Sequence, residues 1–192
     1  MKKIVLGIDP GSENSGIVTF QLFDEWELLS GSNVSNEGLF ELIDKYTLFD
    51  DKVNLFIVYE DIRPFTSRFN MDTINTCKMI GRLECVLNQR RVPFKAITRN
   101  EVKNFVFKRY PDIVLPVVIG KIEKKGGVSK KGKPLKPSFQ YVDDRIVHAA
   151  MRYEYKIEKQ KRGKTNMYGI STHAWQALGV TTAYILSNEQ IL

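Results

Sequence analysis

Two acidic side chains stand where strongly apolar stretches of the sequence end. Residues 3–8, KIVLGI, have the aliphatic and β-branched composition of a strand that is buried on both faces, and Asp9 follows them directly. Residues 53–59, VNLFIVY, form a second stretch of this kind, and Glu60 comes next. Burying a carboxylate at the end of a core strand is costly unless a cation neutralises it. The pattern therefore indicates a cation site, and a metal ion is one suitable cation.

The chemistry available to such a pair is metal-dependent hydrolysis. If the two strands are neighbours in a mixed sheet, Asp9 and Glu60 lie side by side, and two close carboxylates repel each other unless a cation sits between them. Mg²⁺ prefers oxygen ligands and leaves positions for water and phosphate. Two such ions about 4 Å apart can hydrolyse a phosphodiester. We therefore predict Mg²⁺, or Mn²⁺ in its place, as the cofactor, with two ions bound.

Further ligands are expected from the second half of the chain. His173 and Gln176 are three residues apart at the start of a predicted helix, so they share one helix face. Asp143 and Asp144 begin the preceding predicted helix and are rival ligands. The residues alone do not choose between these two sets.

Each of these residues also has a purely structural interpretation. Asp9 begins an Asp-Pro-Gly sequence, which is ordinary turn chemistry. Glu60 is equally compatible with a solvated position paired with Arg63, and His173 with a helix cap or a core position. The occurrence of two acids after two core strands favours the functional interpretation.

The elements that must position these residues follow an α/β order. The sequence predicts three strands in a meander, a helix, a strand, a helix, a strand, and then helices, with a basic insertion near residues 119–138. The expected strands are 3–8, 16–23, 25–29, 53–59 and 93–97, and the expected helices are 36–46, 71–91, 98–108, 143–155 and 172–186. This succession resembles that of ribonuclease H-like folds, in which helices flank a mixed five-stranded sheet.

Two basic segments are candidates for contact with nucleic acid. Residues 119–136 contain seven lysines and one glutamate together with several glycines, which predicts a mobile loop or a β-hairpin arm outside the core. Basic and aromatic residues in the loop after Glu60 could hold and stack on an opened strand. The predicted DNA-binding residues are Arg63, Arg68, Phe69, Lys124, Lys125, Lys130, Lys131 and Lys133.

Composition limits the class of protein. The chain has 192 residues, of which 43% are hydrophobic and 27% charged, and its net charge is +7. These values predict one globular domain over residues 1–192 with a preference for polyanionic partners. No stretch is apolar and long enough for a signal-peptide core or a membrane span, so an intracellular protein is expected. Cys77 and Cys85 stand about 12 Å apart along a predicted helix, which predicts free thiols.

Three motifs resemble the RuvC family of Holliday junction resolvases, particularly its phage-type relatives. They are GIDPG at residues 7–11, VYEDI at 58–62 and HAWQALGV from His173, and the resemblance extends over most of the chain. It implies catalytic and metal-binding roles for Asp9, Glu60 and His173. It further implies a homodimer that binds four-way DNA junctions and nicks two strands symmetrically, in a phage or prophage setting. Gln176 stands where the family has its last aspartate, and Asp61, Asp143 or Asp144 could compensate for the missing charge.

Other functions compete with a resolvase. The glutamine at position 176 is compatible with a junction-binding protein that has lost catalysis. A ribonuclease H that acts on RNA–DNA hybrids would share the fold and the acids. An actin-like kinase or ATPase also begins with a strand, an acid and glycines, but it requires two lobes and a chain about twice as long.

Overall fold

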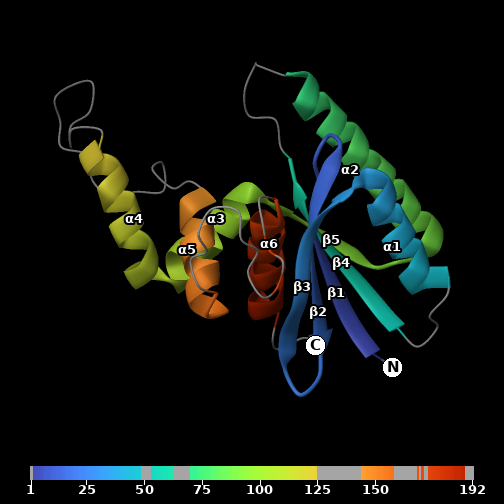
Figure 1. Ribbon diagram of the computed structural model, residues 1–192, viewed down its shortest axis with the longest axis horizontal. Helices are drawn as coiled ribbons and strands as arrows, with labels where there is room; N and C mark the ends of the chain where they lie inside the picture. The colour runs from blue at the N-terminus through green and yellow to red at the C-terminus, as the bar shows by residue number, and fades with distance from the viewer. Residues whose placement is uncertain are drawn as a thin grey trace.

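The computed structural model describes residues 2–48, 53–62, 70–124, 144–157, 168, 170 and 173–188. Helices and strands alternate in the predicted order, with one additional helix (Figure 1). The strands are β1 (Lys2–Asp9), β2 (Asn14–Leu22), β3 (Trp26–Ser35), β4 (Val53–Asp61) and β5 (Phe94–Thr98). The helices are α1 (Asn36–Leu48), α2 (Met71–Arg90), α3 (Arg99–Arg109), α4 (Pro111–Lys124), α5 (Asp144–Glu154) and α6 (Ala174–Ser187).

The five strands form one mixed sheet, which confirms the predicted fold class. Their order is β3-β2-β1-β4-β5; β2 is antiparallel to both of its neighbours, whereas β1, β4 and β5 run parallel. In the register of β1 and β4, Ile8 lies opposite Tyr59. Asp9 and Glu60 each follow by one residue, so the predicted strands bring the two acids to the same end of the sheet.

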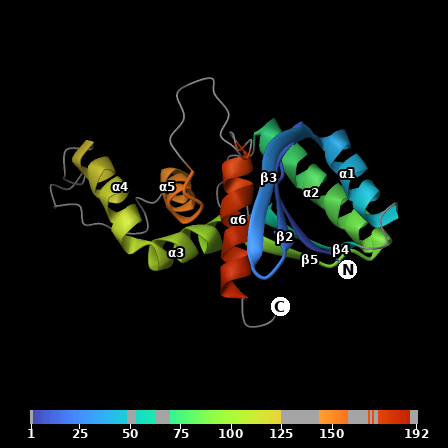
Figure 2. The same cartoon turned by 60° about the horizontal axis from the view of Figure 1, so that its bottom comes forward.

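Helices cover both faces of the sheet. Helices α1 and α2 lie on one face, where the side chains Leu39, Ile43, Leu83 and Leu87 are fully buried against those of β1 and β4. Helix α6 lies on the other face, and Figure 2 shows it standing between the sheet and the group formed by α3, α4 and α5. Its buried side chains belong to the same core as those of the sheet and of α3, α4 and α5, so α6 is the central helix of the larger core.

Glycine allows α6 to approach the sheet closely. A Cβ atom on Gly7, in the middle of β1, would overlap the Oγ1 atom of Thr181 and would lie 2.8 Å from a methyl group of Val18. Thr181 is fully buried, and its hydroxyl donates a hydrogen bond to the carbonyl of Ala177 at 2.7 Å. Gly7 is therefore required at this position because the helix occupies the space that any side chain would need.

Helix α4 was not predicted, and it corrects the expected extent of the basic insertion. Residues 119–124 continue the helix, and Ile122 is buried in the same core as Val114 and Val118. The prediction of a loop or hairpin is therefore wrong for residues 119–124, which are helical, and the prediction that the segment lies outside the core is wrong for Ile122. Spacing of four residues between these three side chains places them on one helix face, which packs toward α5. The rest of the predicted insertion lies outside the described residues.

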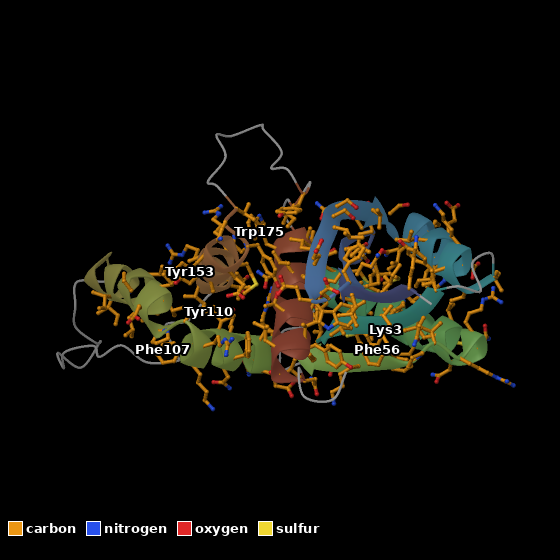
Figure 3. All side chains as sticks on the ribbon, turned by 90° about the horizontal axis from the view of Figure 1, so that it is seen from below. Lys3, Phe56, Phe107, Tyr110, Tyr153 and Trp175 are labelled. Atoms are coloured by element: carbon orange, nitrogen blue, oxygen red, sulfur yellow. The ribbon has the colours of Figure 1, made fainter. Side chains whose placement is uncertain are left out.

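Aromatic contacts join the helices beyond the sheet. Figure 3 shows Tyr110 and Tyr153 near each other at the junction of α3, α4 and α5, with their ring centroids 6.4 Å apart. Trp175 is 7% exposed, as expected of a core residue, and stacks on His148 of α5 at 5.3 Å. These contacts fix the start of α6, where His173 stands.

Several smaller predictions can be compared with the structure. Strand β3 extends to Ser35, six residues beyond its predicted end, because Ser30–Ser35 pair with β2. The prediction stopped early because this part of the sequence has no alternation of apolar and polar residues. Cys77 and Cys85 are free and exposed, as predicted. In the described part of the chain, no helix has both the length and the apolar character needed to cross a membrane.

Candidate active site

Asp9 and Glu60 lie together on the wall of a cavity at the carboxyl ends of β1 and β4. The side chains are largely shielded from solvent, because Asp9 is 8% and Glu60 only 4% exposed. The cavity has a volume of about 610 Å³. It is lined mainly by polar residues of the turn after β1, the ends of β4 and β5 and the start of α2, and by His173. Asp9, Glu60 and His173 therefore line one cavity.

Glu60 is neutralised by a cation from the neighbouring strand. Arg99 follows the end of β5, which is parallel to β4, and its Nε lies 3.0 Å from Glu60 Oε1. Burial raises the pKa of Glu60 to about 7; Arg99 opposes this shift, whereas the negative charges of Asp9 and Asp144 add to it. A second cation beside this buried carboxyl group would therefore favour its charged form.

Asp144 extends the charged cluster away from the cavity. Its Oδ2 lies 3.4 Å from Arg99 Nη2, and its Oδ1 lies 3.2 Å from Lys103 Nζ. Charges therefore alternate from Glu60 through Arg99 and Asp144 to Lys103. Asp144 is not among the residues that line the cavity, so it reaches the site through Arg99.

Asp9 has its own partner on the other side of the site. The Nδ1 atom of His173 lies 2.9 Å from Asp9 Oδ2, and this hydrogen bond raises the pKa of the imidazole. His173 stands just before α6 and lies very close to β2. The approach is so close that a Cβ atom on Gly16 of β2 would overlap the carbonyl carbon of His173. Asp9 and His173, which the resemblance assigns to one site, are thus in direct contact, with Nδ1 directed at the carboxylate.

A buried asparagine holds the turn that follows Asp9. Asn36, the first residue of α1, is 6% exposed, and its Nδ2 donates hydrogen bonds to the carbonyls of Gly11 at 3.1 Å and Ser12 at 3.2 Å. Its Oδ1 accepts a hydrogen bond from the hydroxyl of Ser15 at 2.8 Å. Asp9 therefore begins a turn, as its structural interpretation expects, and it also lines the cavity.

Replacing this asparagine should loosen the turn. We expect Asn36→Ala to lower the free energy of unfolding by about 1–3 kcal/mol, because two partly buried carbonyls and the buried hydroxyl of Ser15 lose their partner. Urea denaturation gives the loss, and amide hydrogen exchange at Gly11–Asn14 should become faster. Asn88→Ala is the control, since the Asn88 amide donates to the Glu84 carbonyl on the exposed side of α2. Equal stability of the two variants would contradict a supporting role for Asn36.

Not every predicted site residue reaches the cavity. Gln176 is 7% exposed, but it is not among the cavity-lining residues, whereas Asp61 is. Within the described ranges, no three His, Cys, Asp or Glu side chains form a group that could hold a metal ion. The other predicted site residues, whose side chains lie outside the described part, are Arg63, Arg68, Phe69, Lys124, Lys125, Lys130, Lys131, Lys133 and Asp143.

Arg99 is the main site residue that sequence analysis missed. One signal is local, because Thr98 and Glu101 form a capping box at the start of α3. The second signal is positional: Arg99 follows the last predicted strand, and carboxyl ends of parallel strands meet at one edge of a sheet. A helix start after such a strand could therefore have indicated a side chain near Glu60.

The donor set at the cavity suits a magnesium ion. Asp9 and Glu60 provide hard oxygen ligands, and Mg²⁺ in proteins is commonly held by one or two carboxylates plus water and substrate phosphate. Burial is the main cause of the raised pKa of Glu60, and the nearby Asp9 adds to it, so a cation bound between the two carboxylates would stabilise their charged forms. Two carboxylates therefore fit a metal that keeps open positions, without a complete cage of protein ligands.

Comparison with known proteins supports the fold. No family model matches the chain, and no curated protein matches it by sequence. Among solved structures, a Thermus thermophilus RuvC in complex with a Holliday junction substrate matches with a TM-score of 0.58 and 14% identity, covering 98% of this chain and 96% of that one. A second Thermus thermophilus RuvC structure matches with a TM-score of 0.55 and 15% identity, covering 97% and 96%. The chain thus has the ribonuclease H-like fold seen in RuvC Holliday junction resolvases.

Proposed function

We propose that this chain is a metal-dependent endodeoxyribonuclease that cuts branched DNA, with residues 1–192 acting as one nuclease domain. The observation that carries the proposal is the pair of buried carboxylates, Asp9 and Glu60, at the ends of neighbouring parallel strands on a cavity wall. The fold it shares with a RuvC bound to a Holliday junction supports four-way DNA as the substrate. The net charge of +7 favours a polyanion.

Each side chain has a role in this proposal. Asp9 and Glu60 would hold Mg²⁺ or Mn²⁺, and His173 orients Asp9 through its hydrogen bond. When bound, the metal would supply activation of water and stabilisation of charge on the phosphodiester. Arg99 is half-exposed at the cavity and provides a positive charge for a phosphate that enters it.

DNA contacts outside the described residues remain part of the proposal. The side chains assigned to them are Arg63, Arg68, Phe69, Lys124, Lys125, Lys130, Lys131 and Lys133. Binding that depends on such lysines falls steeply with salt, because phosphate contacts release counterions. A homodimer, which would place two sites on the two strands of a junction, is likewise proposed.

A second candidate is a junction-binding protein without catalysis. It is favoured by Gln176, which stands in the place of an acid and does not line the cavity. It is also favoured because, among the described residues, no three His, Cys, Asp or Glu side chains are grouped so that they could hold a metal ion. Such a protein would bind branched DNA through its basic segments and leave it uncut.

A cleavage assay separates these functions. Labelled four-way junction, linear duplex of the same sequence and RNA–DNA hybrid are incubated with the protein in Mg²⁺, in Mn²⁺ and in chelator. We expect metal-dependent paired nicks in the junction, with the duplex cut at least about tenfold more slowly. Tight binding of the junction without cutting in either metal would favour the binding protein. Cutting of the hybrid alone would instead show a ribonuclease H.

A further inference from the structure

In the charged cluster beside the cavity, an arginine pairs with Glu60, the residue that is proposed as a metal ligand. Arg99 Nε lies 3.0 Å from Glu60 Oε1, and Glu60 is almost fully buried while the Arg99 side chain is 48% exposed. A carboxylate oxygen that is held by a guanidinium has less charge to offer to a divalent ion, and the two cations repel each other. Arg99 and a metal ion on Glu60 therefore compete.

Asp144 gives the same guanidinium a second acceptor. Its Oδ2 lies 3.4 Å from Arg99 Nη2, so Arg99 can release Glu60 and remain paired. The other oxygen of Asp144, Oδ1, is buried, makes no hydrogen bond and faces the Lys103 ammonium at 3.2 Å. Lys103 is well shielded, with 14% of its side chain exposed, and it holds Asp144 in position.

We infer that Arg99 is an exchangeable counter-cation of the proposed metal site. It neutralises Glu60 while the cavity holds no metal, and Asp144 retains it at the cavity wall when a divalent cation takes its place on Glu60. This inference rests on the proposed function and adds a means of regulation to it. Arg99 stabilises the metal-free site by pairing with Glu60. When a metal ion binds, the guanidinium of Arg99 leaves Glu60 and stays beside the cavity, where a DNA phosphate would enter.

Metal binding without DNA tests the exchange. The affinity for Mn²⁺ is measured by the electron paramagnetic resonance of the free ion, at pH 8 to limit competition by protons. We expect Arg99→Gln to bind Mn²⁺ about tenfold more tightly than the wild type, as for two ligands that exclude each other. The metal-free variant should melt at a lower temperature than the wild type, and saturating Mn²⁺ should narrow that difference.

The chain provides a matched control and a test of the Asp144 contact. Arg90 holds Asp44 through the same atom at the same distance of 3.0 Å, remote from the cavity, so Arg90→Gln should leave the Mn²⁺ affinity unchanged. Asp144→Asn should weaken Mn²⁺ binding in the wild type, because Arg99 then has only Glu60 as its partner. In the Arg99→Gln background, the same substitution should have a smaller effect.

The outcomes separate this inference from the proposed function. Mn²⁺ binding that requires Glu60 but is unchanged or weakened by Arg99→Gln would overturn the exchange and leave the nuclease proposal standing. Absence of Mn²⁺ binding by the wild type, or binding that Glu60→Gln does not reduce, would overturn both. An equal effect of Asp144→Asn in the two backgrounds would show that Asp144 acts on the metal by charge alone and would overturn its role as the acceptor.

Discussion

Asp9→Asn should reduce the single-turnover rate of junction cleavage by at least about a hundredfold. The substitution preserves the size of the side chain and its capacity to accept a hydrogen bond from His173, but it removes the negative charge that a divalent ion requires. Glu60→Gln should have a similar effect for the same reason. The rate is measured on a labelled four-way junction in Mg²⁺, with the enzyme in excess over the DNA.

Two controls give this experiment its meaning. Glu13 lines the same cavity but is exposed in the turn after β1, so Glu13→Gln should cut at a rate within about threefold of the wild type. Junction binding in chelator, measured by gel shift, should be similar for Asp9→Asn and the wild type. An Asp9→Asn protein that binds and cuts like the wild type would show that the carboxylate pair is not the reaction centre.

Gly7→Ala should destabilise the protein strongly, by about 3 kcal/mol in the free energy of unfolding. The added methyl group would overlap the buried hydroxyl of Thr181, so α6 could not keep its present distance from β1. Urea denaturation measures the loss. Because α6 follows His173 directly, we also expect weaker Mn²⁺ binding in whatever fraction remains folded.

Paired variants separate this clash from a general effect of alanine. Gly81 lies on the exposed side of α2 with no atom within 4 Å of an added Cβ, so Gly81→Ala should be more stable than the wild type by about 0.5–1 kcal/mol. Thr181→Ala removes the nearest overlapping atom and should restore part of the stability of Gly7→Ala. A Gly7→Ala protein as stable as the wild type would mean that α6 is held less closely than the structure shows.

The positions of Asp9 and Glu60 at strand ends were predictable because the composition of the preceding stretches and the order of the predicted elements indicate the same place in the fold. The two apolar stretches before Asp9 and Glu60 can only be central strands, and the predicted mixed sheet makes them neighbours. Position 173 was predictable only as part of a motif, since nothing local distinguishes His173 from a helix cap. Its contact with Asp9 depends on how closely α6 approaches β2, which no periodicity reveals.

The errors have equally specific causes. Lysines and glycines after residue 119 suggested the end of regular structure, yet the apolar face formed by Val114 and Val118 continues as far as Ile122. Charged residues at the end of a helix are compatible with burial of its opposite face. Gln176 lies one turn from His173, as expected, and its N–H donates to the His173 carbonyl, but its side chain is buried and does not line the cavity. Tertiary packing decided that position.

The contact between His173 and Asp9 joins residues that are 164 positions apart in the chain. During synthesis on a ribosome, β1 and Asp9 emerge well before α6, which supplies much of the core on one face of the sheet. The site therefore assembles only after α6 has been made. A nascent or prematurely terminated chain would carry both acids without the helix that completes their surroundings, so the proposed cutting activity would be withheld from incomplete chains.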